Sequence, residues 1–300
     1  MDPENPLQAL KTARAEFEKL VGEIRPELHR YCARMTGSVV DGEDVVQETL
    51  AKAFYLLPQT SEISNLRSWI FRIAHNKAID YTRRYDRRFG ESLDDHADLA
   101  ADSQPLEARE MAKIGLSLFM KLTPAQRGAV ILKDVLGHSL LEIGEILDTS
   151  VPSVKGALNR GRAALHKLGR ITVDAAPPPL DASEISLLER YVTHFVAQDF
   201  DSLRALLAQD VRLDVVGIVQ SRGDVQVGGY FHRYSGLSDW SLQVGSVEGR
   251  PAILVFNPQA PAVPTYFILI DWVDGRVARI RDYRYARYVI ADAAVALPEP

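Results

Sequence analysis

The sequence predicts a multidomain protein with an all-α N-terminal half, made of two helical domains, and a C-terminal α+β domain. Three observations predict this fold class. Apolar residues recur at helical spacing through the first half of the chain. Two stretches of different composition interrupt the chain, an acidic one at Glu91–Pro105 and a Pro-rich one at Asp174–Pro179. Beyond the second stretch, runs of β-branched and aromatic residues are separated by turns that contain glycine.

These composition shifts set the expected domain boundaries. We expect a first helical domain at 1–90, an acidic linker at 91–108, a second helical domain at 109–171, a Pro-rich linker at 172–182, an α+β domain at 183–292 and a tail at 293–300.

The composition is that of an ordinary soluble globular protein, with a net charge of −5 and 46% hydrophobic residues. A single cysteine, Cys32, excludes a disulfide framework within the chain and leaves no Cys/His set suited to structural zinc. The N-terminus lacks the pattern of a signal peptide, and apolar runs such as Tyr266–Ile270 are too short to span a bilayer. We therefore expect a cytoplasmic protein that has no metal or cofactor and does not contact the membrane.

The first helical domain contains two segments of different character. Glu43–Phe54 is an amphipathic helix that leaves Asp44, Gln47 and Glu48 on its surface, a pattern that by itself predicts a solvated face. Leu66–Arg88 mixes aromatic residues with cations and amides, which suits phosphate contact combined with base stacking on single-stranded DNA. Its candidate residues are Trp69, Arg72, Asn76, Lys77, Arg83 and Arg84. For Trp69, packing in the core is the alternative interpretation.

The second helical domain ends in two helical segments, Ser139–Leu147 and Val151–Lys167, joined by a tight turn at Asp148–Ser150. This arrangement is typical of a helix-turn-helix, with Ser150 or Ser153 as the N-cap of the second helix. The charges exposed on the second helix are all positive, although the chain as a whole is acidic, which favours a polyanionic partner. The alternative is a solvated basic face on an ordinary helical hairpin. The candidate contact residues are Ser153, Lys155, Asn159, Arg160 and Arg162.

The C-terminal domain begins with helices over Ser183–Leu207, interrupted by a turn at Asp199–Asp201. Strands are expected at Val211–Val219, Ala252–Phe256, Thr265–Trp272 and Arg276–Tyr283. Helices followed by such strands suit a cone-shaped α+β barrel with a curved antiparallel sheet. The candidate pocket residues are Asp214, His232, Tyr266 and Asp271. His194 and Asp282 are further polar candidates, but His194 is more typical of a packed or surface histidine, and the alternative for Asp282 is a pair with Arg281 or Arg284.

Two blocks of the N-terminal half resemble bacterial sigma factors of the extracytoplasmic-function group. Their region 2 is similar to HRYCARMTGSVVDGEDVVQETLAKAF together with LRSWIFRIAHNKAIDYTRR. Their region 4 is similar to LTPAQRGAVILKDVLGHSLLEIGEILDTSVPSVKGALNRGRAAL. The two blocks occur in the family's order, and the resemblance covers residues 14–170.

The resemblance implies two partners, promoter DNA and core RNA polymerase. It places Asp44, Gln47 and Glu48 on the β′ clamp helices, with the β flap as a second polymerase contact. It places the helix from Trp69 to Arg84 on the −10 element and the helix from Val151 to Arg162 in the −35 major groove. Many members carry an arginine where this chain has Ala157, so the −35 contacts are expected at the other polar positions of that helix.

The C-terminal domain resembles the SnoaL-like branch of the nuclear transport factor 2-like superfamily, which includes isomerases, cyclases and non-catalytic binding modules. Fold alone does not decide among these activities. We expect no catalytic residue and no enzyme activity, and we expect the domain to modulate a sigma factor, with a small-molecule ligand in its cone as one means. The alternatives are an isomerase or cyclase fused to a DNA-binding region and a ligand-sensing helix-turn-helix repressor.

Overall fold

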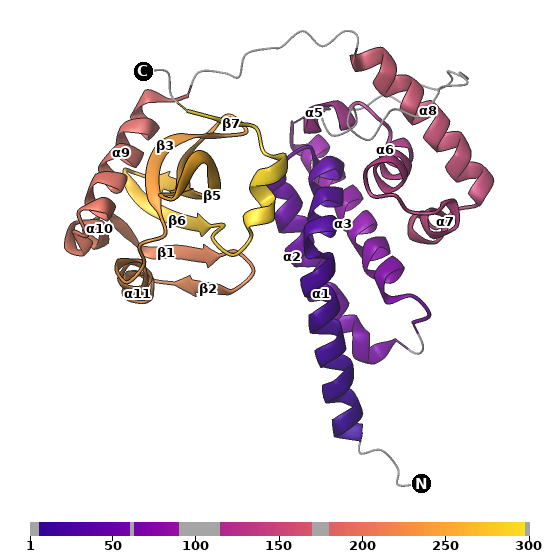
Figure 1. The fold of residues 1–300 in the computed structure, drawn as a ribbon, viewed down its shortest axis with the longest axis horizontal. Helices are drawn as coiled ribbons and strands as arrows, with labels where there is room; N and C mark the ends of the chain where they lie inside the picture. The colour runs from indigo at the N-terminus through magenta and orange to yellow at the C-terminus, as the bar shows by residue number, and fades with distance from the viewer. Residues whose placement is uncertain (1–5, 61–62, 90–114, 170–179, 298–300) are drawn as a thin grey trace. The chain divides into compact units, whose positions relative to one another are not determined.

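The protein is described by a computed structural model over residues 6–60, 63–89, 115–169 and 180–297, and it divides into two compact units, residues 1–174 and 175–300 (Figure 1). The expected acidic linker at 91–108 and most of the Pro-rich linker at 172–182 lie outside the described residues. Among the described residues, none of the helices combines the length and the apolar composition that a membrane-spanning helix needs.

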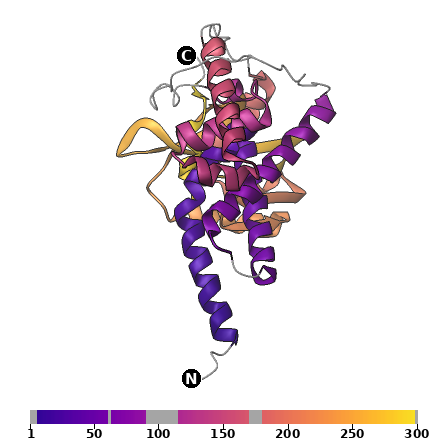
Figure 2. The same ribbon diagram turned by 90° about the vertical axis from the view of Figure 1, so that its right-hand side faces the viewer.

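The first helical block of the N-terminal unit consists of α1 (Pro6–Thr36), α2 (Val39–Leu56) and α3 (Leu66–Phe89), which lie alongside one another (Figures 1 and 2). A short 3₁₀ helix, Leu57–Gln59, follows α2. The helix expected over Glu43–Phe54 begins earlier, because the Ser38 side chain accepts a hydrogen bond from the backbone N–H of Asp41 at 3.2 Å and caps the helix.

The second helical block consists of α5 (Leu116–Phe119), α6 (Pro124–Val130), a π-helical turn (Ile131–Val135), α7 (Leu140–Leu147) and α8 (Val151–Gly169). Capping boxes begin α6, at Thr123, and α7, at Ser139. Ser150 caps α8 by accepting the Ser153 N–H at 3.3 Å, which selects one of the two expected N-caps. The helix-turn-helix prediction is confirmed.

Both helical blocks contribute to one hydrophobic cluster. Leu28 and Phe71 of the first block and Ile131 and Ile143 of the second are fully buried in it. The guanidinium of Arg127, which is 1% exposed, donates to four backbone carbonyl oxygens, those of Phe119, Met35, Met120 and Leu122. Because Met35 belongs to α1, this side chain also joins the two blocks. The separation into two helical domains stays a prediction.

The C-terminal unit consists of one seven-stranded sheet and three α-helices. The helices are α9 (Ala182–Val196), α10 (Phe200–Leu206) and α11 (Asp224–Ser235). Aromatic side chains of α9 and α11 form its interior, where Phe195 meets Tyr234 edge-on with ring centroids 5.3 Å apart. The strands are β1 (Leu207–Val215), β2 (Val219–Arg222), β3 (Ser241–Val247), β4 (Arg250–Asn257), β5 (Ala260–Val273), β6 (Arg276–Asp282) and β7 (Val295–Ala296). A 3₁₀ helix at Arg287–Asp292 contacts β5.

The α+β prediction for this unit is confirmed, but the sheet differs from the expectation in two respects. The strand order β2-β1-β6-β5-β4-β3-β7 leaves two edges, so the sheet is not a closed barrel, although it is curved (Figure 1). The pair β1–β6 is parallel, so the sheet is mixed and not purely antiparallel. The expectation also lacked α11, β2, β3 and β7. The strands β2 and β7 are only four and two residues long, and α11 contains the adjacent glycines Gly228 and Gly229, which weaken a helical signal.

A buried histidine in the shared core of the helical unit should make the stability of the protein depend on pH. The side chain of His75 on α3 is buried, its Nδ1 lies 2.7 Å from the Tyr31 hydroxyl, and burial lowers its pKa to about 4. Protonation is therefore disfavoured in the folded state but proceeds at the ordinary pKa of 6.5 in the unfolded chain. We expect this histidine to lower the free energy of unfolding by about 3 kcal/mol between pH 7 and pH 4.

Urea unfolding followed by circular dichroism at several pH values measures this effect. The variant His75→Gln retains an acceptor for Tyr31 but does not titrate, so it should lose less stability on acidification than the wild type. Parallel loss of stability in the two proteins would contradict the assignment.

Candidate nucleic-acid interface

The second helix of the helix-turn-helix, α8, presents a polar and cationic face. Ser153, Lys155, Asn159 and Arg160 are all exposed on it, as the sequence predicts. Ala157 is only 6% exposed, so this position points into the core and does not belong to that face. Four of the five predicted contact residues of α8 therefore lie where an external ligand can reach them.

The fifth predicted residue, Arg162, is held by an intramolecular ion pair. Its Nε and Nη2 donate to the two carboxylate oxygens of Asp134 at 2.9 and 2.5 Å. The side chains are only 12% and 6% exposed, and the hydrogen bonds to Asp134 raise the pKa of Arg162. This bidentate pair fixes α8 against the π-helical turn, so Arg162 is positioned for stability more than for contact with DNA.

The predicted cations of α3 are exposed or half-buried, and carboxylates of neighbouring helices pair with several of them. Arg72 pairs with Asp148 in the turn of the helix-turn-helix, and Lys77 donates to Glu48 of α2 at 2.9 Å. Asn76, Arg83 and Arg84 are exposed, and Arg84 lies 4.0 Å from the same carboxylate of Glu48. Trp69 is half-buried and packs against the hydrophobic cluster, in agreement with the core interpretation.

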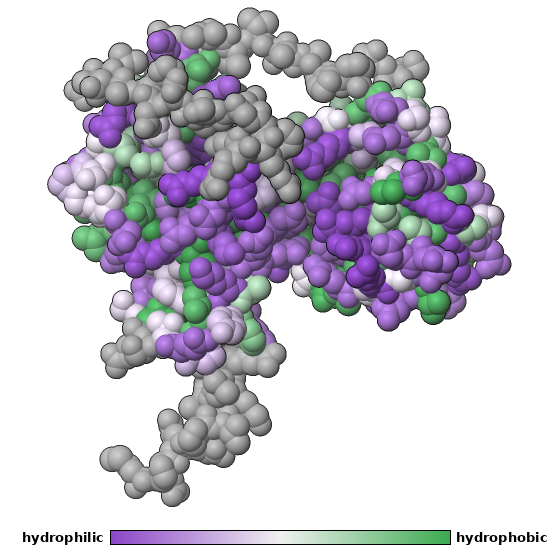
Figure 3. Space-filling view, turned by 180° about the vertical axis from the view of Figure 1, so that it is seen from behind, coloured by the Kyte–Doolittle hydropathy of each residue, from purple (hydrophilic) through white to green (hydrophobic). Residues whose placement is uncertain are grey.

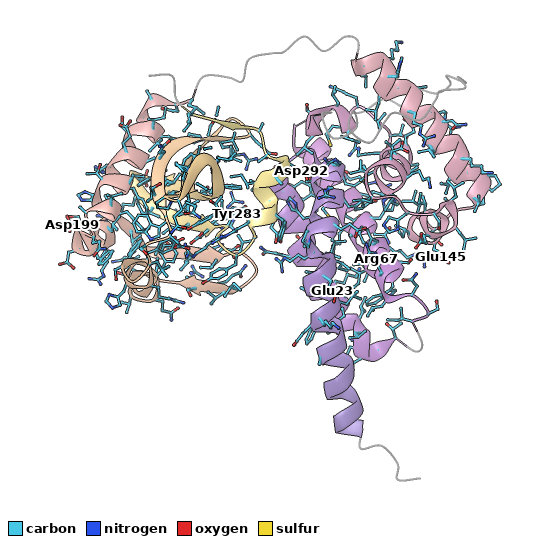
Figure 4. All side chains as sticks on the ribbon, viewed as in Figure 1. Glu23, Arg67, Glu145, Asp199, Tyr283 and Asp292 are labelled. Carbon is cyan, nitrogen blue, oxygen red and sulfur yellow. The ribbon has the colours of Figure 1, made fainter. Side chains whose placement is uncertain are left out.

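The turn that presents Asp148 has an unusual backbone. Asp148 adopts the left-handed conformation with φ 55°, and its N–H bonds to the carbonyl of Gly144. A groove of about 490 Å³ lies beside this turn, lined by residues of α3, α7 and the start of α8, including Arg72, Glu145 and Val151 (Glu145 is labelled in Figure 4).

A second polar cluster joins α1, α3 and the start of α7. Arg67, labelled in Figure 4, pairs with Glu27 of α1, and His138 lies 3.2 Å from the other oxygen of that carboxylate. Burial alone would raise the pKa of Glu27, but the hydrogen bonds from His138 and Arg67 outweigh it and hold the pKa below its usual value.

The residues predicted to contact polymerase occupy one side of α2. Asp44 and Gln47 are half-buried, and Glu48 is exposed. The structure thus places an acidic residue of the predicted polymerase face directly beside cations of the predicted −10 face.

The four candidate pocket residues of the C-terminal unit do not converge. Asp214 is buried beside Arg279 at 3.6 Å on the outer face of the sheet, and Asp271 is exposed 4.0 Å from Arg281. His232 is exposed on α11. Only Tyr266 reaches the interior.

The interior contains a polar network that the sequence did not reveal. The carboxylate of Asp282 accepts hydrogen bonds from the hydroxyls of Tyr230 at 2.9 Å and Tyr234 at 2.6 Å, and from the backbone N–H of Arg284 at 2.9 Å. Burial raises the pKa of Asp282, although these hydrogen bonds act against it. The spacing of Tyr230 and Tyr234, one helical turn apart, was the signal for these partners, but it depends on α11, which was not predicted.

Comparison with known proteins agrees with the two helical blocks. A sigma-70 region 2 model matches residues 20–88, and a sigma-70 region 4 model matches residues 116–165. The ECF RNA polymerase sigma factor SigG of Mycobacterium tuberculosis is 29% identical over 223 residues, which cover 66% of this chain and 60% of that protein. The chain therefore spans less than two thirds of that relative. The ECF sigma factor EcfG of Rhodopseudomonas palustris is 32% identical over 157 residues, which cover 50% of this chain and 82% of EcfG.

The chain is also similar to solved structures. The sigma factor SigJ of Mycobacterium tuberculosis is 21% identical, with a TM-score of 0.34, over 87% of this chain and 93% of that one. A protein of Sinorhizobium meliloti described as a polyketide cyclase is 19% identical, with a TM-score of 0.27, over 32% of this chain and 92% of that one. The sequence matches show that the chain belongs to the family of extracytoplasmic function (ECF) RNA polymerase sigma factors.

Proposed function

We propose that this protein is a sigma subunit that directs core RNA polymerase to promoters with specific −10 and −35 elements. The observation that carries the proposal is the exposed cationic face of α8 within a helix-turn-helix, in a member of the sigma factor family. A recognition helix of this kind reads base edges in the major groove, while its cations contact phosphates. The residues proposed for this contact are Ser153, Lys155, Asn159 and Arg160.

The cations of α3 suit contact with the −10 element. To bind a phosphate there, each paired cation must first leave its carboxylate partner. Arg72 would leave Asp148, and Lys77 would leave Glu48. Exposed ion pairs of this type contribute about 0–1 kcal/mol, so phosphates can replace the carboxylates at small cost. We propose Asn76, Arg83 and Arg84 as further contacts of this helix.

The C-terminal unit is proposed to modulate the sigma unit and not to catalyse a reaction. Its buried acid, Asp282, already accepts hydrogen bonds from two tyrosines and a backbone amide, as expected of a network that stabilises a core. Because the units belong to one chain, even a weak contact made by the C-terminal unit acts at high effective concentration. A ligand of this unit would act through different affinities for the states of the sigma unit.

Run-off transcription with purified core RNA polymerase tests the proposed function. The full chain should direct transcripts from promoters that its complex with polymerase binds, whereas core polymerase alone should not. Absence of a transcript from every promoter bound by the complex would refute the proposal. A chain that ends after Arg170 should alter the yield if the C-terminal unit modulates the sigma unit.

The acidic face of α2 gives a prediction about polymerase binding. We expect the double variant Asp44→Lys/Glu48→Lys to abolish binding to core polymerase, because it replaces two negative charges on the proposed docking face. Native gel shift with core enzyme measures the binding, and circular dichroism checks the helices. Glu23→Lys, an exposed acid of α1 labelled in Figure 4, is the matched control and should bind normally. Normal assembly of the double variant would show that polymerase docks elsewhere.

Two arginines of α8 should separate DNA contact from stability. Arg160→Ala should weaken −35 binding by about 1–3 kcal/mol if the side chain contacts a base, and should change the free energy of unfolding by less than about 0.5 kcal/mol. Arg162→Ala should lower the free energy of unfolding by about 1–3 kcal/mol, because it leaves the Asp134 carboxylate buried without its guanidinium. Fluorescence anisotropy and urea unfolding measure the two effects. The reverse pattern would mean that the two assignments are exchanged.

A further inference from the structure

The sheet of the C-terminal unit places three arginines in one row across three adjacent strands. Arg212 of β1 is paired in register with Arg222 of β2 on one side and with Arg279 of β6 on the other. Residues directly opposite each other in neighbouring strands project from the same face, so the three guanidiniums share one face of the sheet.

This face is opposite to the one that packs against α11. Asp214 and Arg281, which share the face with the row, are buried, whereas Arg212 and Arg222 are exposed and Arg279 is half-buried. Leu213 and Ile280, the sequence neighbours of Arg212 and Arg279, are paired with each other and buried. Asp282, which projects to the same side as Ile280, accepts hydrogen bonds from α11. Because side chains alternate along a strand, the arginines point away from α11. The surface in view in Figure 3 is mainly hydrophilic, with apolar side chains scattered over it.

Nearby carboxylates neutralise the positive charge of this row only in part. Arg222 lies 3.9 Å from Asp210, and Arg279 lies 3.6 Å from Asp214, both beyond ordinary hydrogen-bond distance. The central residue, Arg212, is exposed, and its guanidinium has no ion pair or hydrogen bond with the residues that the structure describes. Like charges directly opposite each other on a sheet cost stability. A row with an unpaired cation at its centre is therefore unfavourable for the fold, as residues of a binding site often are.

We propose that this row is a contact site for the phosphate backbone of duplex DNA. Strands lie about 4.8 Å apart, so the row is about 10 Å long, and one DNA strand carries a phosphate for about every 3.4 Å of helix axis. Guanidinium groups bind phosphate with a matched pair of N–H donors. The choice of DNA as the polyanion rests on the proposed function, because DNA held by the helical unit is then presented to the C-terminal unit at high effective concentration. The contact is independent of sequence.

The salt dependence of DNA binding tests the site in the full chain assembled with core polymerase. The probe is a fluorescent duplex of mixed sequence, titrated at a series of NaCl concentrations. Arg212→Gln should reduce the slope of log K against log salt by about one and weaken binding equally on different sequences. Arg190→Gln, which removes an exposed arginine from α9, is the matched control and should keep the wild-type slope.

Stability provides the second readout. Because Arg212→Gln removes repulsion within the row, its urea midpoint should equal or exceed that of the wild type. A lower midpoint together with an unchanged salt slope would mean that the row has a structural role. An unchanged slope with weaker binding to core polymerase would mean that the row faces an acidic protein surface. Either result would refute the DNA contact without refuting the proposed sigma function. The proposed sigma function is refuted separately, if the wild-type complex directs no transcript.

Discussion

The helical unit depends on one buried cation. Arg127 is a charged side chain in a hydrophobic cluster, and its burial is tolerable only because its N–H groups find acceptors. Those acceptors are backbone carbonyls at the end of α1 and around α5, including Met35 and Phe119. The carbonyl oxygens at the end of a helix have no partner within the helix, so the guanidinium and the helix end satisfy each other. Loss of this side chain would leave several buried acceptors unpaired in both helical blocks at once.

The sequence predicted the elements whose signal is local. The apolar periodicity of α3, α7 and α8 and the serine before α8 are readable from neighbouring residues, and those predictions are confirmed. The tertiary contacts within each unit could not be predicted from the sequence, because they join residues far apart in the chain. Arg127 meets Met35 across 92 positions, and Tyr230 meets Asp282 across 52. In the C-terminal unit α11 was not predicted, so Tyr230 and Tyr234 were not recognised as partners of Asp282, and arginine side chains were the only partners considered for it.

The same limit applies to the candidate sites. Periodicity correctly separated the exposed polar positions of α8 from its buried ones, but it could not distinguish Arg160, which is exposed, from Arg162, which Asp134 holds. The distinction depends on the π-helical turn that carries Asp134, an element that no pattern in the sequence indicates. Likewise, the facing charges of Glu48 and Lys77 become one ion pair only when α2 and α3 pack together.

These contacts indicate what opposes separation of the two helical blocks. If promoter binding requires α3 and α8 to move apart, the ion pair of Arg72 with Asp148 must break, but both side chains are largely exposed and such pairs contribute at most about 1 kcal/mol. The buried apolar residues oppose separation more strongly. Phe71 on α3 and Ile143 on α7 are fully buried in the shared cluster, and each such side chain costs about 1.5–3 kcal/mol to expose. The ion pair therefore orients the two blocks, while hydrophobic burial and the bonds of Arg127 hold them together.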